Sequence, residues 1–200
     1  MRRSTLERRD SKPRKPPINE TESQRYGEWL TSSQEITMSE LEPKVNPPEL
    51  PVSSQVDLDR ARLLSRLDEF GLAEREVEGD GNCQFRAVSD QLYGSQGHHM
   101  LVRSQCVDQL LLAPERYRDY VVNEDSFDAY VQKMSMQGSW GDHVTLQALA
   151  DFHGSEINLI TSFESDQIVV VRPRSATAAP GAPLWMSFWA EIHYASVGMK

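Results

Sequence analysis

From residue 56 onward, apolar residues recur first at the spacing of helices and later at the spacing of strands. One helical face is predicted from four apolar side chains: Leu63, Leu64, Leu67 and Phe70. Asp57 or Asp59 is expected to cap the start of this helix, and Gly71 to close its end. An extended segment follows at 75–78, and the glycines within 79–82 then require a tight turn.

Four more helices are predicted before residue 154. The first covers about 83–94, and the second covers about 99–112 and stops before a proline. The third has Ser126 or Asp125 as its cap, and its apolar residues fall at i, i+3, i+4 and i+7: Phe127, Tyr130, Val131 and Met134. The fourth starts at Asp142 and turns three residues toward the core: Leu146, Leu149 and Ala150.

After Gly154 the period of the apolar pattern shortens to that of strands. Four segments have this pattern: 157–160, 167–171, 184–189 and 192–197. Helices therefore come first and strands follow, with one early strand before the glycine turn. This order predicts a mixed α/β (α+β) domain in which helices flank a largely antiparallel sheet.

Composition divides the chain into two parts. Seven of the 11 prolines lie in the first 51 residues, and residues 1–15 carry seven Lys/Arg against two Asp/Glu. Residues 1–55 are predicted to be a disordered or weakly ordered tail, apart from a short candidate helix around Trp29 to Leu41. The basic start is typical of a nuclear address or of a contact with an acidic partner, and a plain solvated tail is the alternative. The folded domain is expected to span residues 56–200.

Several functional classes are excluded by simple counts. No run of 18 apolar residues exists, so no membrane span is expected, and residues 1–15 lack the apolar stretch of a secretory signal. Two cysteines allow neither a disulfide framework nor a four-thiolate metal site, which favours a reducing compartment, cytoplasmic or nuclear. The Asn19 sequon is then attributed to chance. The net charge of −9 argues against sequence-independent binding of nucleic acid.

Cys83 carries the strongest chemical signal. A glycine turn places it at the first residue of a helix, where unpaired backbone N–H groups favour a thiolate and lower the thiol pKa. The same N–H groups can receive the oxyanion of a tetrahedral acyl intermediate. The alternative is a small buried cysteine at a helix start.

A catalytic thiol needs a base, and His193 is the leading candidate. It lies on the last predicted strand, where the alternation places Glu191, His193 and Ala195 on one face. A structural histidine on a strand is the alternative. The other histidines have weaker claims because they lie near the ends of predicted helices: His98, His99, His143 and His153.

Other residues that could carry chemistry are assigned to packing. Cys106 falls on one helical face with Val102 and Leu110, so it is expected in the core. Three tryptophans are also assigned to the core: Trp140, Trp185 and Trp189. Trp140, next to Gly141, is alternatively a residue that lines the active site. The turn at 79–81 is no phosphate loop, because Gln84 stands where a third glycine is needed.

Three separated motifs carry a resemblance to a known family: Asp80-Gly81-Asn82-Cys83-Gln84-Phe85-Arg86-Ala87, Trp140-Gly141-Asp142-His143 and Phe188-Trp189-Ala190-Glu191-Ile192-His193-Tyr194. In this order they resemble the ovarian-tumour (OTU) family of cysteine deubiquitinases, and most of all its plant-type members. The resemblance extends from about Val56 to Val197. It implies the papain-like OTU fold.

The resemblance also implies residue roles and partners. Cys83 would be the nucleophile, His193 the general base, and Asp80 a member, with Gly81 and Asn82, of the active-site loop that helps to form the oxyanion pocket. The implied reaction is thiol-dependent hydrolysis of the isopeptide bond at the C-terminal glycine of ubiquitin. Implied partners are ubiquitin, polyubiquitin chains and ubiquitinated proteins. No metal or organic cofactor is implied, and a monomer is expected.

One position departs from the family pattern. Family members place Asn or Asp two residues after the catalytic histidine, where it orients the imidazole, whereas this chain has Ala195. In serine proteases the loss of the orienting carboxylate costs about 10⁴ in turnover. Conceivable substitutes are Asp80, Glu191, a backbone carbonyl or water, and Asp80 is preferred over Glu191 because Glu191 approaches the histidine from the wrong end.

Three functional hypotheses follow. The first is a deubiquitinase, with activity reduced by Ala195. The second is a catalytically weak or inactive module that binds ubiquitin through the same surface. The third is a structural interaction protein that makes no contact with ubiquitin.

Overall fold

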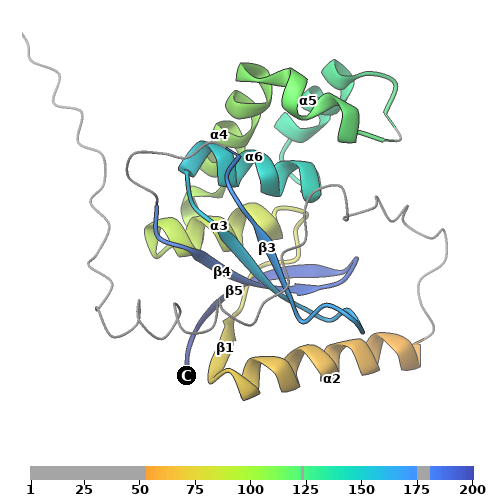
Figure 1. Cartoon of the computed structure of the whole chain (residues 1–200), viewed down its shortest axis with the longest axis vertical. Coiled ribbons are helices and arrows are strands. Elements are labelled where there is room, and N and C mark those ends of the chain that lie inside the picture. The colour runs from red at the N-terminus through yellow and green to blue at the C-terminus, as the bar shows by residue number, and fades with distance from the viewer. Residues whose placement is uncertain (1–52, 123, 175–180) are drawn as a thin grey trace, which may run out of the picture.

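A computed structural model describes residues 53–122, 124–174 and 181–200 (Figure 1). The predicted tail at 1–55 lies outside these residues except for its last three, and the candidate helix around Trp29 to Leu41 lies outside them entirely. Helix α2 (Ser53–Glu69) begins three residues before the predicted domain boundary. Among the described residues, no helix is both long and apolar enough to cross a membrane.

The first strand lies earlier than predicted. Strand β1 is Leu72–Arg75, whereas the sequence pattern placed the extended segment at 75–78. The turn after α2 passes through Gly71, which has a φ of +65°, and leads directly into the sheet. There Leu72 pairs with Met199, so a strand far along the chain decides where β1 begins.

The four helices that follow agree closely with their predicted positions. They are α3 (Cys83–Tyr93), α4 (His99–Leu112), α5 (Phe127–Ser135) and α6 (His143–His153), with short 3₁₀ turns η1 (Gln96–His98), η2 (Pro114–Arg116) and η3 (Arg118–Tyr120). The predicted cap Ser126 accepts a hydrogen bond from the N–H of Ala129 at 3.1 Å. Asp142 caps α6 in the same way, through the N–H groups of Val144 and Thr145.

Five strands form one sheet in the order β1-β5-β4-β2-β3. The last four are β2 (Ile157–Thr161), β3 (Ile168–Val171), β4 (Leu184–Trp189) and β5 (His193–Met199). The β1–β5, β5–β4 and β2–β3 pairs are antiparallel and the β2–β4 pair is parallel, so the prediction of a largely antiparallel sheet is confirmed.

Strand β5 begins at His193, one residue later than predicted. The N–H of Ile192 bonds the carbonyl of Trp189 at 2.9 Å and closes a turn between β4 and β5. Glu191 lies in this turn with a φ of +59°, so it does not share a strand face with His193 as the alternation suggested.

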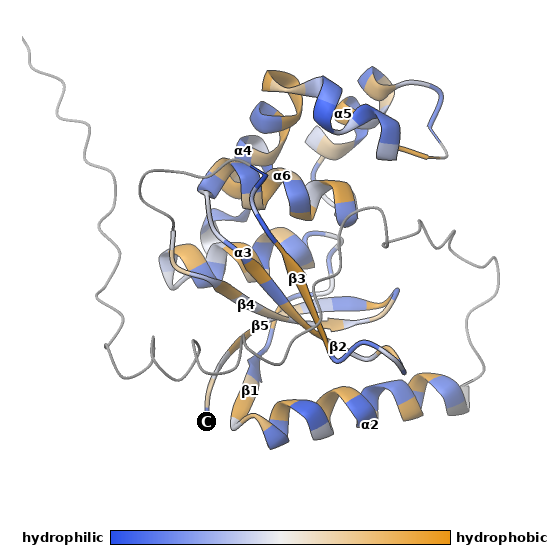
Figure 2. Ribbon diagram, in the orientation of Figure 1, coloured by the Kyte–Doolittle hydropathy of each residue, from blue (hydrophilic) through white to orange (hydrophobic). Residues whose placement is uncertain are grey.

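Helices cover both faces of the sheet, as Figures 1 and 2 show. Helix α2 packs on one face through a small core of six buried residues: Leu63, Leu67, Leu72, Ile160, Trp185 and Val197. The larger core lies on the other face, beneath α3, α4 and α6. Trp140 belongs to neither core because 59% of it is exposed, which corrects its assignment to packing.

Candidate active site

A tight turn brings the chain to the N-terminus of α3. Gly81 has a φ of +80°, and a Cβ atom there would lie 2.0 Å from the carbonyl oxygen of Gly138. Residues 79–82 therefore press against the loop between α5 and α6. Only glycine meets both the conformation and the spacing at this position.

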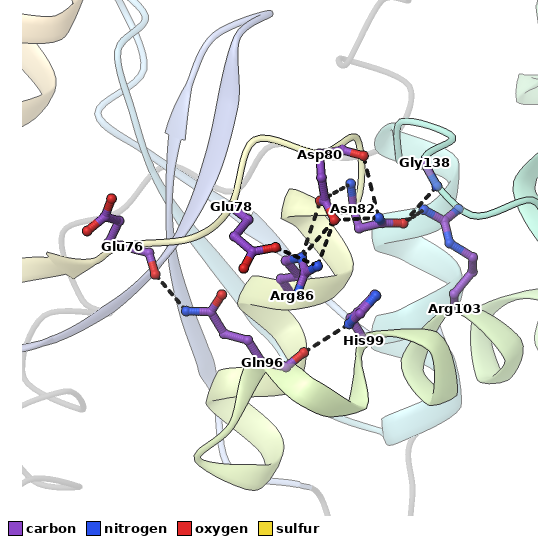
Figure 3. Close-up of polar contacts among 9 residues, drawn as sticks. All are labelled: Glu76, Glu78, Asp80, Asn82, Arg86, Gln96, His99, Arg103 and Gly138. Carbon is purple, nitrogen blue, oxygen red and sulfur yellow. Dashed lines mark hydrogen bonds and ion pairs between the residues drawn. The ribbon is translucent and has the colours of Figure 1, made fainter.

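Asp80 braces this turn from within (Figure 3). Its carboxylate accepts hydrogen bonds from the backbone N–H of Asn82 at 3.0 Å and from the Nδ2 group of Asn82 at 2.9 Å. The Arg86 guanidinium, on the first turns of α3, binds the same carboxylate at 2.6 Å and Glu78 at 2.8 Å. The hydrogen bond from Arg86 is the main reason why the pKa of Asp80 lies well below its usual range.

Asn82 joins the turn to the rest of the domain. Its side-chain oxygen accepts hydrogen bonds from the N–H of Gly138 at 2.9 Å and from the Arg103 guanidinium at 2.7 Å. Arg103 is only 1% exposed and also donates to the carbonyls of Met134 and Ser139. Its guanidinium lies 3.9 Å from the centre of the Phe85 ring. One buried cation thus connects α4, the start of α3 and the α5–α6 loop.

The Cys83 thiol lies at the first residue of α3 and is nearly covered. Burial raises the pKa of this thiol, and the nearby Asp80 charge adds to the effect. Hydrogen bonds from the backbone of Tyr194, Gln84 and Cys83 itself act in the opposite direction and lower the pKa. The helix N-terminus therefore acts as the sequence suggested, but burial outweighs it. The net shift of the Cys83 pKa is therefore upward, opposite to the lowering that the helix start predicted.

His193 is half-buried at the start of β5 and pairs with Trp189. Burial lowers its pKa below 6.5, and the positive charge of Arg60 adds to this effect. The Glu74 carboxylate and a hydrogen bond to the backbone carbonyl of Val77 act in the opposite direction. His193 is therefore neutral near pH 7 and able to accept a proton.

The structure brings the two candidate residues to the same place. The backbone of Tyr194, directly after His193 along β5, lies close enough to the Cys83 thiol to lower its pKa. Gln84, directly after Cys83, bonds the side chain of Tyr194 and also Thr145 at 2.7 Å. A thiol, backbone N–H donors and a neutral imidazole together suit attack on an acyl carbonyl.

The other histidines lie at helix ends. His98 and His99 stand where η1 meets α4, and the Nδ1 atom of His99 contacts the Gln96 carbonyl at 3.1 Å. His143 is the first residue of α6 and His153 the last. Cys106 is fully buried, with its sulfur 3.7 Å from the Thr145 carbonyl, and burial raises the pKa of this thiol strongly.

The acidic residue near His193 is not one of the two that the sequence suggested as substitutes for the missing Asn or Asp. Asp80 is engaged by Arg86 and Asn82, and Glu191 lies in the β4–β5 turn. The acidic group whose charge acts on His193 is Glu74, on β1. The Val77 carbonyl accepts a hydrogen bond from His193, so it is a backbone carbonyl of the kind considered above as a substitute for the missing Asn or Asp.

Sequence reasoning missed Glu74, Gln84 and Arg103 as parts of the site. A signal existed for Arg103, because it falls on the helical face of Cys106 and Leu110 and is thus predicted to be buried. Glu74 carries no such signal, because its role depends on pairing between strands far apart in the chain. In the described ranges, no group of three or more His, Cys, Asp or Glu side chains is placed to hold a metal ion.

Comparison with known proteins gives consistent matches. The sequence model of a family described as OTU-like cysteine protease matches residues 78–195. Ovarian tumor domain-containing deubiquitinating enzyme 12 of Arabidopsis thaliana is 45% identical over 148 residues, which are 74% of this chain and 66% of that protein. Enzyme 9 of the same series is 44% identical over 155 residues, 78% of this chain and 44% of that protein. The chain thus spans less than two thirds of the length of these curated relatives.

Solved structures agree on the fold. The structure of the OTUD1 OTU domain matches with a TM-score of 0.60 at 21% identity, over 72% of this chain and 99% of that chain. The complex of h/ceOTUB1, ubiquitin aldehyde and UBCH5B~Ub matches with a TM-score of 0.53 at 13% identity, over 70% of this chain and 82% of that chain. These likenesses concern the fold alone, and they confirm the predicted papain-like OTU domain.

Proposed function

The chain belongs to the OTU-like cysteine protease family, and on that premise we propose that it is a thiol-dependent deubiquitinase that cleaves isopeptide bonds at the C-terminal glycine of ubiquitin. The observation that carries the proposal is the surroundings of Cys83. Its thiol lies at the first residue of α3, and the backbone of Tyr194, next to His193, lies close enough to lower the pKa of the thiol. The relatives named as deubiquitinating enzymes support the choice of substrate.

The proposed mechanism starts from a neutral pair. His193 takes the proton of the Cys83 thiol as the sulfur bonds to the glycine carbonyl carbon, and the N–H groups of Cys83 and Gln84 stabilise the oxyanion. The isopeptide C–N bond then breaks, and its nitrogen takes the proton from His193. A water molecule gives a proton to His193 and attacks the thioester, which releases ubiquitin and restores the thiol.

The loop residues are assigned supporting roles. Asp80 holds the turn through Asn82 and Arg86, and Gly81 lets the turn approach Gly138. Together they fix the N–H groups at the start of α3. We assign no step to a metal or an organic cofactor.

A ubiquitin probe with an electrophile in place of its C-terminal carboxylate tests the proposal. The wild-type protein should gain the mass of one ubiquitin, and peptide mapping should place the bond on Cys83 and not on buried Cys106. Absence of labelling, or labelling on Cys106, would overturn the proposal.

A second candidate function is favoured by Ala195, which cannot orient an imidazole. It is a catalytically weak module that binds ubiquitin through the same surface. This candidate predicts that ubiquitin chains bind while the probe does not label the wild-type protein. A protein that neither reacts nor binds would support the third hypothesis, an interaction protein without ubiquitin contact.

The pH dependence of hydrolysis follows from the pKa of His193. The imidazole accepts a proton only when neutral, and its pKa is lowered from 6.5, so activity should persist above that pKa and fall as the pH drops through it. The acid limb of kcat/KM, measured with a fluorogenic ubiquitin substrate, should therefore have its midpoint below pH 6.5. A midpoint above pH 7 would contradict this assignment of the base.

Trp140→Ala should weaken substrate binding more than turnover. Trp140 is 59% exposed and lies two residues beyond Gly138, which contacts the Gly81 turn. An exposed indole at this place is suited to contact the ubiquitin tail, so KM should rise about tenfold with little change in kcat. Leu112→Ala, which removes an apolar side chain that is 78% exposed at the end of α4, should leave both constants unchanged. Equal effects of the two variants would rule out a specific contact.

A further inference from the structure

Ala195 contributes only a methyl group to one face of β5. His193, Ala195 and Val197 share this face because alternate residues of a strand point the same way. Glu74 of β1 pairs with Val197, and Ser187 of β4 pairs with Ala195. Side chains from three neighbouring strands therefore meet beside His193, on the side of the sheet that α2 covers.

The Glu74 side chain crosses this face of β5. Its Oε1 atom accepts a hydrogen bond from the Ser187 hydroxyl at 2.7 Å. Strand β5 lies between β1 and β4, so the Glu74 side chain must pass over β5 to reach Ser187. It does so next to Ala195, on the face where a family member carries the orienting Asn or Asp.

Helix α2 holds the Glu74 carboxylate through Arg60. The Arg60 guanidinium binds Glu74 through two hydrogen bonds, at 2.9 and 2.5 Å, and the Glu74 side chain is only 16% exposed. Arg60 also lies 5.2 Å from the centre of the ring of Trp189, which pairs with His193. Ser187 and Arg60 thus hold the carboxylate in one place beside the histidine.

The charges in this group act on one another. Burial would raise the pKa of Glu74, but hydrogen bonds from Arg60 and Ser187, together with the charges of Arg60 and His193, lower it below its usual value. Glu74 is therefore ionised near neutral pH. Its charge raises the pKa of His193, and the charge of Arg60 lowers it. Glu74 and Arg60 are the charged side chains that shift His193 in the described part of the chain.

We propose that Glu74 is a positioning residue, which supplies from β1 the negative charge that Ala195 cannot supply and stabilises the imidazolium of His193. The Val77 carbonyl accepts a hydrogen bond from the ring, and Glu74 contributes the charge. The catalytic role of Glu74 rests on the proposed hydrolysis. Its effect on the pKa of His193 can be measured without ubiquitin.

An NMR titration of the histidine ring protons separates this role from a purely structural one. Glu74→Gln removes the negative charge and should lower the pKa of His193 by about one unit, a tenfold change in proton affinity. Arg60→Gln breaks the same ion pair but should raise the pKa of His193. Glu76→Gln removes an exposed charge two residues away and is the matched control. If Glu74→Gln and Arg60→Gln shift His193 in the same direction, or not at all, the inference is wrong.

Kinetics test the catalytic meaning. Glu74→Gln should lower kcat about tenfold to a hundredfold, less than the roughly 10⁴ lost with a carboxylate that hydrogen-bonds the imidazole, with KM nearly unchanged. Asn at position 195 should restore part of this loss when Ala195→Asn is combined with Glu74→Gln. Wild-type hydrolysis without any effect of Glu74→Gln would overturn the inference and leave the proposed function standing. If Glu74→Gln shifts the His193 pKa but the wild-type protein does not react with ubiquitin, the proposed function is wrong and the electrostatic role of Glu74 stands.

Discussion

Cys83→Ala is expected to abolish hydrolysis of ubiquitin substrates. Alanine offers no atom that can form the thioester, so only solvent hydrolysis aided by the surrounding N–H groups remains. Removal of the nucleophile of a protease typically costs about 10⁶ in kcat, and the loss here should reach the detection limit of a fluorogenic assay. Probe labelling should disappear together with turnover.

Cys106→Ala is the matched control, because it removes the other thiol of the chain. The Cys106 side chain is fully buried between α4 and α6, and its sulfur contacts the Thr145 carbonyl at 3.7 Å. Its loss should lower the free energy of unfolding by about 1 to 2 kcal/mol and leave kcat/KM within about twofold of wild type. An active Cys83→Ala protein, or an inactive but folded Cys106→Ala protein, would reverse the assignment of the nucleophile.

Gly81→Ala should damage both stability and activity. The added Cβ would lie 2.0 Å from the Gly138 carbonyl oxygen, and the φ of +80° is unfavourable for alanine. Strain and overpacking together should lower the free energy of unfolding by about 3 kcal/mol, measured by urea denaturation. Because the turn holds the start of α3, kcat should fall even at temperatures where the variant is folded.

Two other glycines separate the causes of this effect. Gly79→Ala has open space around the new methyl group and no positive φ, so it should be close to neutral. Gly71→Ala also has open space, but its φ of +65° should cost about 1 kcal/mol through backbone strain alone. If Gly81→Ala costs no more than Gly71→Ala, the contact between Gly81 and Gly138 does not constrain the turn.

The positions of most helices and strands were available from local patterns. Helix α5 is an example, because Ser126 and four apolar residues at helical spacing fix both its start and its face. Strand β1 was displaced by three residues because its start depends on pairing with β5, at the other end of the chain. Glu191 was predicted to share a face with His193 for a related reason, since alternation alone does not show where a hairpin turn ends.

The chemistry of the site was predicted less completely than its location. The motif around Cys83 and the strand carrying His193 do come together, but the pKa of Cys83 was predicted to shift downward, whereas burial shifts it upward. The helix N-terminus is visible in sequence, whereas the burial that outweighs it arises from packing against β5. The contribution of Glu74 was invisible for the same reason, because it comes from across the sheet.

The buried guanidinium of Arg103 has a consequence for the behaviour of the protein in acid. Its hydrogen-bond partners are the amide oxygen of Asn82 and the carbonyls of Met134 and Ser139, none of which titrates. Asp80, which braces the same turn, keeps its charge to unusually low pH. The hydrogen bonds that shape the turn should therefore persist at a pH where His193 is already protonated. Inactivation by mild acid should be immediate and fully reversible, because it protonates the general base and leaves the active-site loop folded.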